Sequence, residues 1–253
     1  MILHNKKGQV AIFVIVAIII VAIFVLYLAL SNKPILSGQN EVNFQSAIDK
    51  CVKDAVEEAT DKMIPQGGFI EPENYKIYKN TKVSYLCENI GYYKPCINQH
   101  PLLINEEVKE IENYIAPRVE QCFSNTKTEL EKRNYNVLMS GMNLSVSLAS
   151  GKIIIDIDRK VTLSKNEQTQ TFDKFNVELT NPIYDLSKVA IEIANQESKF
   201  CYFEYVGYMI LYPKVSIEKF AFSDSTKIYT IRDKQSKKEM NIATRSCAIP
   251  GGI

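Results

Sequence analysis

The strongest hydrophobic pattern in the chain is an uninterrupted apolar run from Val10 to Leu30. Every residue in it is Val, Ala, Ile, Phe, Leu or Tyr. A helix of that length spans about 30 Å, which is the thickness of the hydrocarbon core of a bilayer. A core helix of a globular domain would carry a polar face, and this run carries none. Residues 10–30 are therefore predicted to form a transmembrane helix, with membrane lipid as its partner.

The residues that flank this run predict its orientation. Lys6 and Lys7 precede it, and no acidic residue occurs among the first nine. The positive-inside rule then keeps residues 1–9 cytoplasmic, as a short basic tail or leader. Residues 31–40 contain Asn, Pro, Ser and Gly and are expected to form a linker. The remainder of the chain is expected to be extracellular, on a single-pass protein of the cell membrane.

Residues 41–133 are predicted to be the helical part of this ectodomain. Apolar residues recur at steps of three and four over Glu41–Met63, as in an amphipathic helix. Pro65 and the two glycines after it end the pattern. Residues 69–86 are rich in Tyr and predict a hairpin or an irregular arm.

A second amphipathic helix is expected to start at Asn105, whose side chain can cap it. Glu106 and Glu107 fall in its first turn, where the helix dipole favours acidic residues. Its apolar stripe runs over residues 108–123, and Pro117 is expected to kink it.

From Asn134 onward the hydrophobic period changes from helical to alternating, which predicts a mainly antiparallel β part over residues 134–253. One long helix is expected within it, at residues 184–211, after Asn181-Pro182. Strands are expected at 144–148 and 153–161, and a polar turn at 162–169 is followed by a strand through Phe172 and Phe175 to Leu179. Residues 215–232 are also strand-like, and 240–247 close the chain.

The cysteines agree with an extracellular location. All six follow the apolar run, and an even number outside the membrane indicates disulfides. Zinc is disfavoured, because the chain has no Cys-x-x-Cys pair and only two histidines. Connectivity stays open: Cys87 and Cys96 bracket a short loop, Cys51 and Cys122 lie on the two apolar stripes, and Cys201 and Cys247 remain.

Together these patterns predict an α+β fold, with one N-terminal transmembrane helix followed by a disulfide-stabilised ectodomain of amphipathic helices and an antiparallel sheet. The net charge is +1, and basic and acidic residues are interspersed. Because nucleic-acid binders usually carry a basic stripe, no nucleic-acid partner is expected.

Candidate catalytic groups are few. His100 is the only histidine after the apolar run, and no nucleophile motif accompanies it. Asp156 and Asp158 alternate on one expected strand, with Asp173 as a third acid, which suits a carboxylate pair or a calcium site. The solvated face of an amphipathic strand explains the same pattern. The chain is therefore expected to be no enzyme, with no metal and no cofactor.

Two features suggest binding or modification on the outer side. Tyrosines cluster before the second helix, and Tyr suits contacts with sugars or proteins, although such rings can equally fill a small core. Asn143-Leu144-Ser145 is an N-glycosylation sequon, which points to Asn143 as an acceptor. The clustered tyrosines are Tyr75, Tyr78, Tyr85, Tyr92 and Tyr93.

The junction Lys6-Lys7-Gly8-Gln9 followed by a long apolar helix resembles the class III signal of archaeal type IV pilin-like proteins. The resemblance implies cleavage after Gly8, a mature chain beginning at Gln9, and partners that are further copies or other pilin-like subunits bound through the N-terminal helix. A plain signal anchor remains the alternative. The linker at 31–40 favours a tethered ectodomain or a minor component over a major pilin.

A looser resemblance covers most of the chain. The same junction, Cys51 in its helix, Gln66–Ile70, and the strand Lys152–Asp158 leading to Val161–Ser164 look like a group of uncharacterised membrane-anchored archaeal proteins. That likeness implies a cell-surface location and no activity. The expected function is thus a structural, adhesive or pilin-like surface protein. The alternatives are an anchored ectodomain that binds a ligand or glycan, and an envelope-acting hydrolase.

Overall fold

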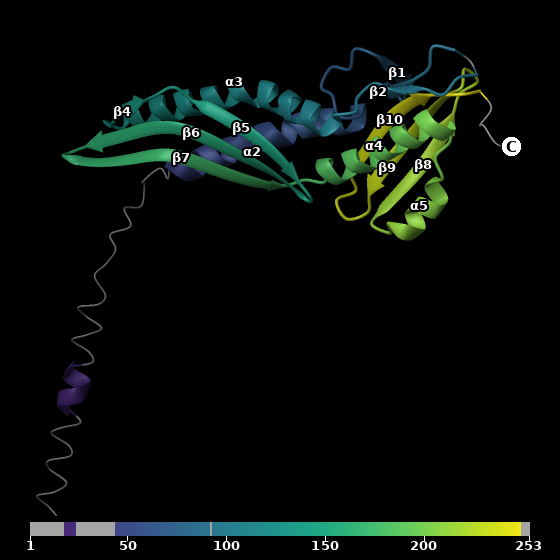
Figure 1. Ribbon diagram of the computed structural model, residues 1–253. Helices are drawn as coiled ribbons and strands as arrows, with labels where there is room; N and C mark the ends of the chain where they lie inside the picture. The colour runs from purple at the N-terminus through teal and green to yellow at the C-terminus, as the bar shows by residue number, and fades with distance from the viewer. Residues whose placement is uncertain (1–17, 24–43, 92, 249–253) are drawn as a thin grey trace, which may run out of the picture. The chain divides into compact units, whose positions relative to one another are not determined.

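The computed structural model describes residues 18–23, 44–91 and 93–248 (Figure 1). The expected tail at 1–9, the Gly8–Gln9 junction and the linker at 31–40 lie outside these ranges, as does most of the apolar run. Its described part, residues 18–23, is helical and exposed. Within the described ranges, no helix combines the length and hydrophobicity needed to cross a bilayer. The chain divides at residues 42/43 into two units, and the second unit contains both sheets and the four helices α2 to α5.

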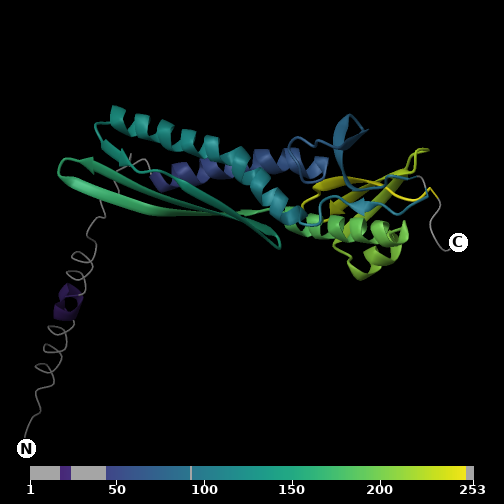
Figure 2. The same cartoon turned by 45° about the horizontal axis from the view of Figure 1, so that its top comes forward.

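Two long helices pack against a four-stranded antiparallel sheet. Helix α2 (Phe44–Met63) packs along α3 (Leu103–Lys132), and both lie on one face of the sheet (Figures 1 and 2). Phe123 is at the centre of this core, with ring centroids 6.1 Å from Phe44 and 5.1 Å from Phe175. The strands are β4 (Asn136–Met139), β5 (Asn143–Ala149), β6 (Lys152–Lys165) and β7 (Gln168–Thr180).

Strand β6 is the centre of this sheet, with β7 along one edge and both β5 and β4 along the other. Its residues alternate, so that Ile153, Ile155 and Ile157 are buried against the helices while Asp156 and Asp158 are exposed. An antiparallel sheet with one packed and one wet face is what the alternation predicted.

The second sheet is mixed, whereas an antiparallel one was expected. Its order is β1-β2-β10-β9-β8, with β3 paired to β2, and β2 and β10 run parallel. This pairing joins residues from both sides of the expected division at 133/134. Helix α4 (Ile183–Phe200) packs on the sheet and α5 (Tyr205–Leu211) on β8. The strands are β1 (Tyr75–Tyr78), β2 (Thr81–Glu88), β3 (Ile97–Asn98), β8 (Val215–Ala221), β9 (Thr226–Asp233) and β10 (Glu239–Arg245).

Two expected boundaries in the β part were wrong. Strands β6 and β7 continue to a tight turn at Asn166 and Glu167, both with positive φ, where a turn over 162–169 was expected. The Thr and Ser residues there suit strands as well as turns. The expected helix 184–211 is two helices, because Cys201 adopts a left-handed conformation (φ 56°) that ends α4.

Helix α3 also differs from its expected form. It begins at Leu103 rather than Asn105, and the residue before it, Leu102, makes no side-chain capping bond. It runs on through Pro117 to Lys132. Only Glu106 falls in its first turn, whereas both Glu106 and Glu107 were expected there. Glu107 faces the interior, because it shares the buried stripe of Leu103 and Ile111.

Three disulfides hold the unit together. They join Cys51 to Cys122, Cys87 to Cys96, and Cys201 to Cys247. The expectation of disulfide bonding is confirmed, and the pairs are those suggested by the stripes, by the short loop and by elimination. The Cys51–Cys122 bond links α2 to α3, and the Cys201–Cys247 bond links the end of α4 to the segment after β10.

Candidate functional site

A cavity of about 380 Å³ lies where the chain enters the second sheet. It is enclosed by the loop between residues 66 and 75, by β2, by the segment after β3 and by α3. The residues that line it are Phe69, Glu71, Pro72, Glu73, Asn74, Ser84, Tyr85, Gln99, His100 and Glu110.

The loop that forms one wall is held by specific contacts. Gly67 and Gly68 both have positive φ (82° and 98°), which turns the chain after the short 3₁₀ helix η1 (Ile64–Gln66). The Gln66 side-chain amide donates to the carbonyl oxygens of residues 69 and 70, at 3.2 and 2.7 Å. The Ile70 amide donates to Glu110 Oε2 at 3.2 Å, which ties the loop to α3.

His100 lines the cavity from the segment after β3. Its Nδ1 is 2.6 Å from Glu106 Oε2, and its ring centroid is 4.6 Å from that of Phe69. The His100 backbone amide donates to Asn98 Oδ1 at 3.0 Å. These contacts fix the imidazole against an aromatic ring with one nitrogen on a carboxylate.

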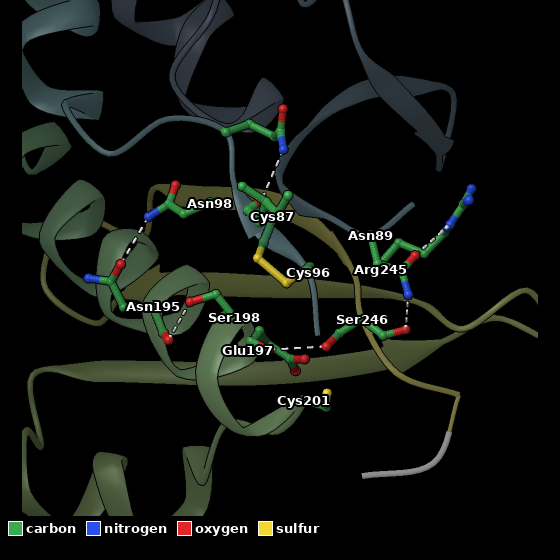
Figure 3. Close-up of a disulfide and its surroundings, with 12 residues drawn as sticks. Cys87, Asn89, Cys96, Asn98, Asn195, Glu197, Ser198, Cys201, Arg245 and Ser246 are labelled. Atoms are coloured by element: carbon green, nitrogen blue, oxygen red, sulfur yellow. Dashed lines mark hydrogen bonds between the residues drawn. A yellow bond between two sulfur atoms is a disulfide. The ribbon is translucent and has the colours of Figure 1, made fainter. Parts of the chain in front are cut away.

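The segment that carries His100 is anchored beside the Cys87–Cys96 disulfide (Figure 3). Asn98 Nδ2 donates to Asn195 Oδ1 in α4 at 2.9 Å. On the other side, Asn89 Nδ2 donates to the Ser246 carbonyl oxygen at 2.9 Å. The disulfide loop is thereby fastened to α4 and to the segment directly after β10, which holds this side of the cavity in place.

The cavity has an acidic and aromatic lining. Glu71, Glu73 and Glu110 contribute carboxylates, and among the described residues that line it none is Lys or Arg. Such a lining disfavours anions and suits a cation, which carboxylates attract and aromatic faces also bind.

A nucleophile beside His100 would be a hydroxyl of the cavity lining. Ser84 also lines the cavity, but among the described residues no hydrogen bond joins it to His100. Nor does the described part of the chain hold a group of three or more His, Cys, Asp or Glu side chains that could bind a metal ion.

The expected acid pair is on the open face of the first sheet. Asp156 accepts from Asn176 Nδ2 at 2.7 Å, and Asp158 is 3.8 Å from Lys174 Nζ. Both face solvent, as does Asp173, and none of them lines the cavity that contains His100. Asn143 is exposed at the start of β5.

The four described tyrosines of the expected cluster differ in their surroundings. Tyr85 is buried and shares a 3.0 Å hydrogen bond with the Thr226 hydroxyl. Tyr78 packs against the rings of Phe220 and Phe222. Tyr75 and Tyr93 are exposed, 39% and 75%, at separate places in the chain, and Tyr92 lies outside the described residues.

Sequence reasoning missed the lining residues Phe69 and Gln99, which lie in segments without a periodic pattern. It also missed Glu110, which stands outside the buried stripe of α3. It also missed Glu107, although a signal was present. Glu107 stands four residues after Leu103 and four before Ile111, within the apolar stripe of α3. A charged residue at such a position is expected to be buried.

Comparison of the chain with protein-family models, with curated proteins and with solved structures finds no significant match.

Proposed function

We propose that this chain is a single-pass, membrane-anchored extracellular surface protein with a structural or adhesive role. The observation that carries the proposal is the set of three disulfides, which pair all six cysteines. Disulfides persist in oxidising compartments and are rare in the cytosol. The apolar run at 10–30, with Lys6 and Lys7 before it, supports an anchor with its C-terminal side outside.

The placement of candidate groups supports a role without catalysis. Asp156 and Asp158 lie on the solvated face of one sheet, whereas His100 lines a cavity beside the other. A hydrolase of envelope polymers would need such groups to converge on one substrate.

The location is tested by protease treatment of intact native cells. The proposal expects that residues 44–248 are digested or released while a cytosolic marker stays intact. Protection of the chain in intact cells, with digestion only after lysis, would contradict it.

The pilin-like form of the proposal adds cleavage between Gly8 and Gln9 and association through the N-terminal helix. Its support is the resemblance at residues 6–9. The intact mass of the chain from its native host distinguishes the forms. A mature chain beginning at Gln9 supports pilin-like processing, and a chain beginning at Met1 leaves a plain signal anchor.

The cavity favours a second candidate function, the binding of a small organic cation such as a primary amine or guanidinium. In this candidate the ligand would contact Phe69 and His100 in the cavity, rather than a tyrosine surface. We expect that Glu71→Gln with Glu73→Gln weakens binding of a panel of amines in calorimetry, while Glu129→Gln on the exposed side of α3 does not. Equal binding by both variants would remove this candidate.

A further inference from the structure

Helix α5 presents an apolar face to solvent, which reverses the usual pattern of a surface helix. Its sequence is Tyr-Val-Gly-Tyr-Met-Ile-Leu, and none of its residues is buried. Val206, Ile210 and Leu211 are 51%, 76% and 76% exposed, and Tyr212, directly after the helix, is 54% exposed. At 100° per residue, Val206, Ile210 and Leu211 share one side of the helix.

The opposite side of α5 is the one attached to the protein. The Tyr208 ring is 5.3 Å from that of Phe203, and Met209 Sδ accepts from the Ile217 amide at 3.0 Å. The helix is therefore held in place by Tyr208 and Met209, and the described residues leave at least half of each of Val206, Ile210 and Leu211 exposed.

The exposed apolar residues extend along one short segment, which we call the α5 patch. It comprises Phe200, Tyr202, Val206, Ile210, Leu211 and Tyr212, six of the fourteen large hydrophobic side chains exposed among the described residues from 44 to 248. Scattered single residues of this kind are normal, whereas exposed apolar side chains that gather in one place accompany interaction sites. Four of the six lie on α5 or directly after it.

The rim of the α5 patch is basic at the C-terminal end of the helix. Lys234 Nζ donates to the Pro213 carbonyl oxygen at 2.8 Å, and its amide donates to the Lys214 carbonyl oxygen at 3.0 Å. Lys214, Lys234 and Lys237 are all exposed. Of the acids beside them, Asp233 accepts from the Ser236 amide and hydroxyl.

The acid at the other end of the helix is also engaged. Glu204 accepts from the amides of Val206 and Gly207 and, at 2.6 Å, from the Tyr202 hydroxyl. Glu204 and Asp233 keep their negative charges, but at the C-terminal end of α5 three exposed lysines stand against the single acid Asp233. That end of the patch therefore has a net positive charge, which complements an anionic surface.

The size of the patch distinguishes between occupants. A specific interface between two proteins uses about 20–30 residues a side, and the α5 patch supplies six. Shallow insertion into a bilayer needs only an apolar helix face with lysines beside it, since lipid has no shape to match. We propose that the α5 patch docks this unit onto an anionic membrane surface, with Ile210 and Leu211 among the acyl chains and the lysines at the headgroups.

The chain offers a clean probe, because it contains no Trp. In the variant Leu211→Trp the only indole is on the α5 patch. In the control variant Leu138→Trp the only indole is on β4, at a residue that is 64% exposed and remote in sequence from the patch. The full chain is reconstituted into liposomes of phosphatidylcholine with or without phosphatidylglycerol. Flotation with the liposomes tests whether residues 10–30 anchor the chain, and the indole emission tests whether the α5 patch contacts lipid. Failure of the proposed anchor can therefore be distinguished from failure of the proposed docking.

We expect a blue shift and quenching by brominated lipid for Leu211→Trp in anionic liposomes, and neither effect for Leu138→Trp. Adding Ile210→Ser abolishes both. Adding Lys214→Gln lowers the ratio of docked to undocked protein about fivefold, the equivalent of about 1 kcal/mol.

Two results overturn the proposal. One is solvent-like emission of Leu211→Trp that is the same in anionic and neutral liposomes. The other is a shift that persists in detergent without lipid or that grows with protein density at constant lipid, which would make a second copy the occupant of the α5 patch.

Discussion

Replacing the buried acid Glu107 with Gln should change how stability depends on pH. The Glu107 side chain is wholly buried between α3 and α4. The Ser187 hydroxyl donates to its Oε1 at 2.6 Å, while Oε2 has no partner among the described residues. Burial raises the pKa of this carboxyl well above its usual range, and the hydrogen bond from Ser187 only partly opposes it.

The sign of the effect follows from linkage. Since the pKa of Glu107 is higher in the folded state, its carboxyl stays protonated there while the unfolded chain has already ionised above the ordinary value of 4.5. Its stabilising contribution is complete below that pH and is lost as the pH rises toward the folded-state pKa. Over that window this one group lowers the free energy of unfolding by about 1.4 kcal/mol per pH unit.

The assay is urea denaturation of residues 43–253 with the disulfides intact, at several pH values from 4.5 to neutral. The side chain in Glu107→Gln keeps an acceptor for the Ser187 hydroxyl and cannot ionise. The free energy of unfolding of this variant should therefore fall less steeply with rising pH than that of the parent. The difference between the two slopes should be at most that of one ionising group. Glu129→Gln, on the exposed side of α3, is the control and should match the parent. If Glu107→Gln showed the parent's slope, the assignment of a neutral buried acid would be refuted.

Two further predictions concern the same unit. Gly68→Ala should lower the free energy of unfolding by about 2 kcal/mol or more, because a Cβ there would lie 2.4 Å from Glu107 Oε1 at a φ of 98°. Gly151→Ala, also at positive φ but with no atom within 4 Å of the new Cβ, should cost only about 1 kcal/mol in the same denaturation assay; equal losses would exclude the contact with Glu107. Replacing both cysteines of the Cys51–Cys122 disulfide, 71 residues apart, by Ala should cost about 4.4 kcal/mol on loop entropy, against about 2.6 kcal/mol for the Cys87–Cys96 disulfide, 9 residues apart. A larger loss for the short loop, measured by the same denaturation, would contradict the entropic reasoning.

Elements built from local periodicity could be predicted from the sequence. The apolar stripe over Glu41–Met63 and the alternation of Ile153, Ile155 and Ile157 each determine which face is buried, so the helix and the first sheet could be derived. The disulfide between Cys51 and Cys122 could be suggested for the same reason, since a cysteine on each stripe brings the two together when the stripes pack.

Features that depend on distant parts of the chain could not be predicted. The parallel pairing of β2 with β10 joins Tyr85 to Ala243, and no local pattern indicates such a partner. The cavity depends on that pairing and on a loop turned by two glycines, so its lining could not be assembled beforehand. The break at Cys201 was hidden because helical spacing continues on both sides of it.

The redox state of the cysteines in the native chain tests most directly whether residues 44–248 are an extracellular, disulfide-bonded unit. Freshly isolated native material is alkylated without reduction, and its mass is measured before and after treatment with a reductant. We expect no adduct before reduction and six afterwards, because all six cysteines form disulfides in an oxidising compartment. Six adducts before reduction would contradict both the disulfides and the extracellular location.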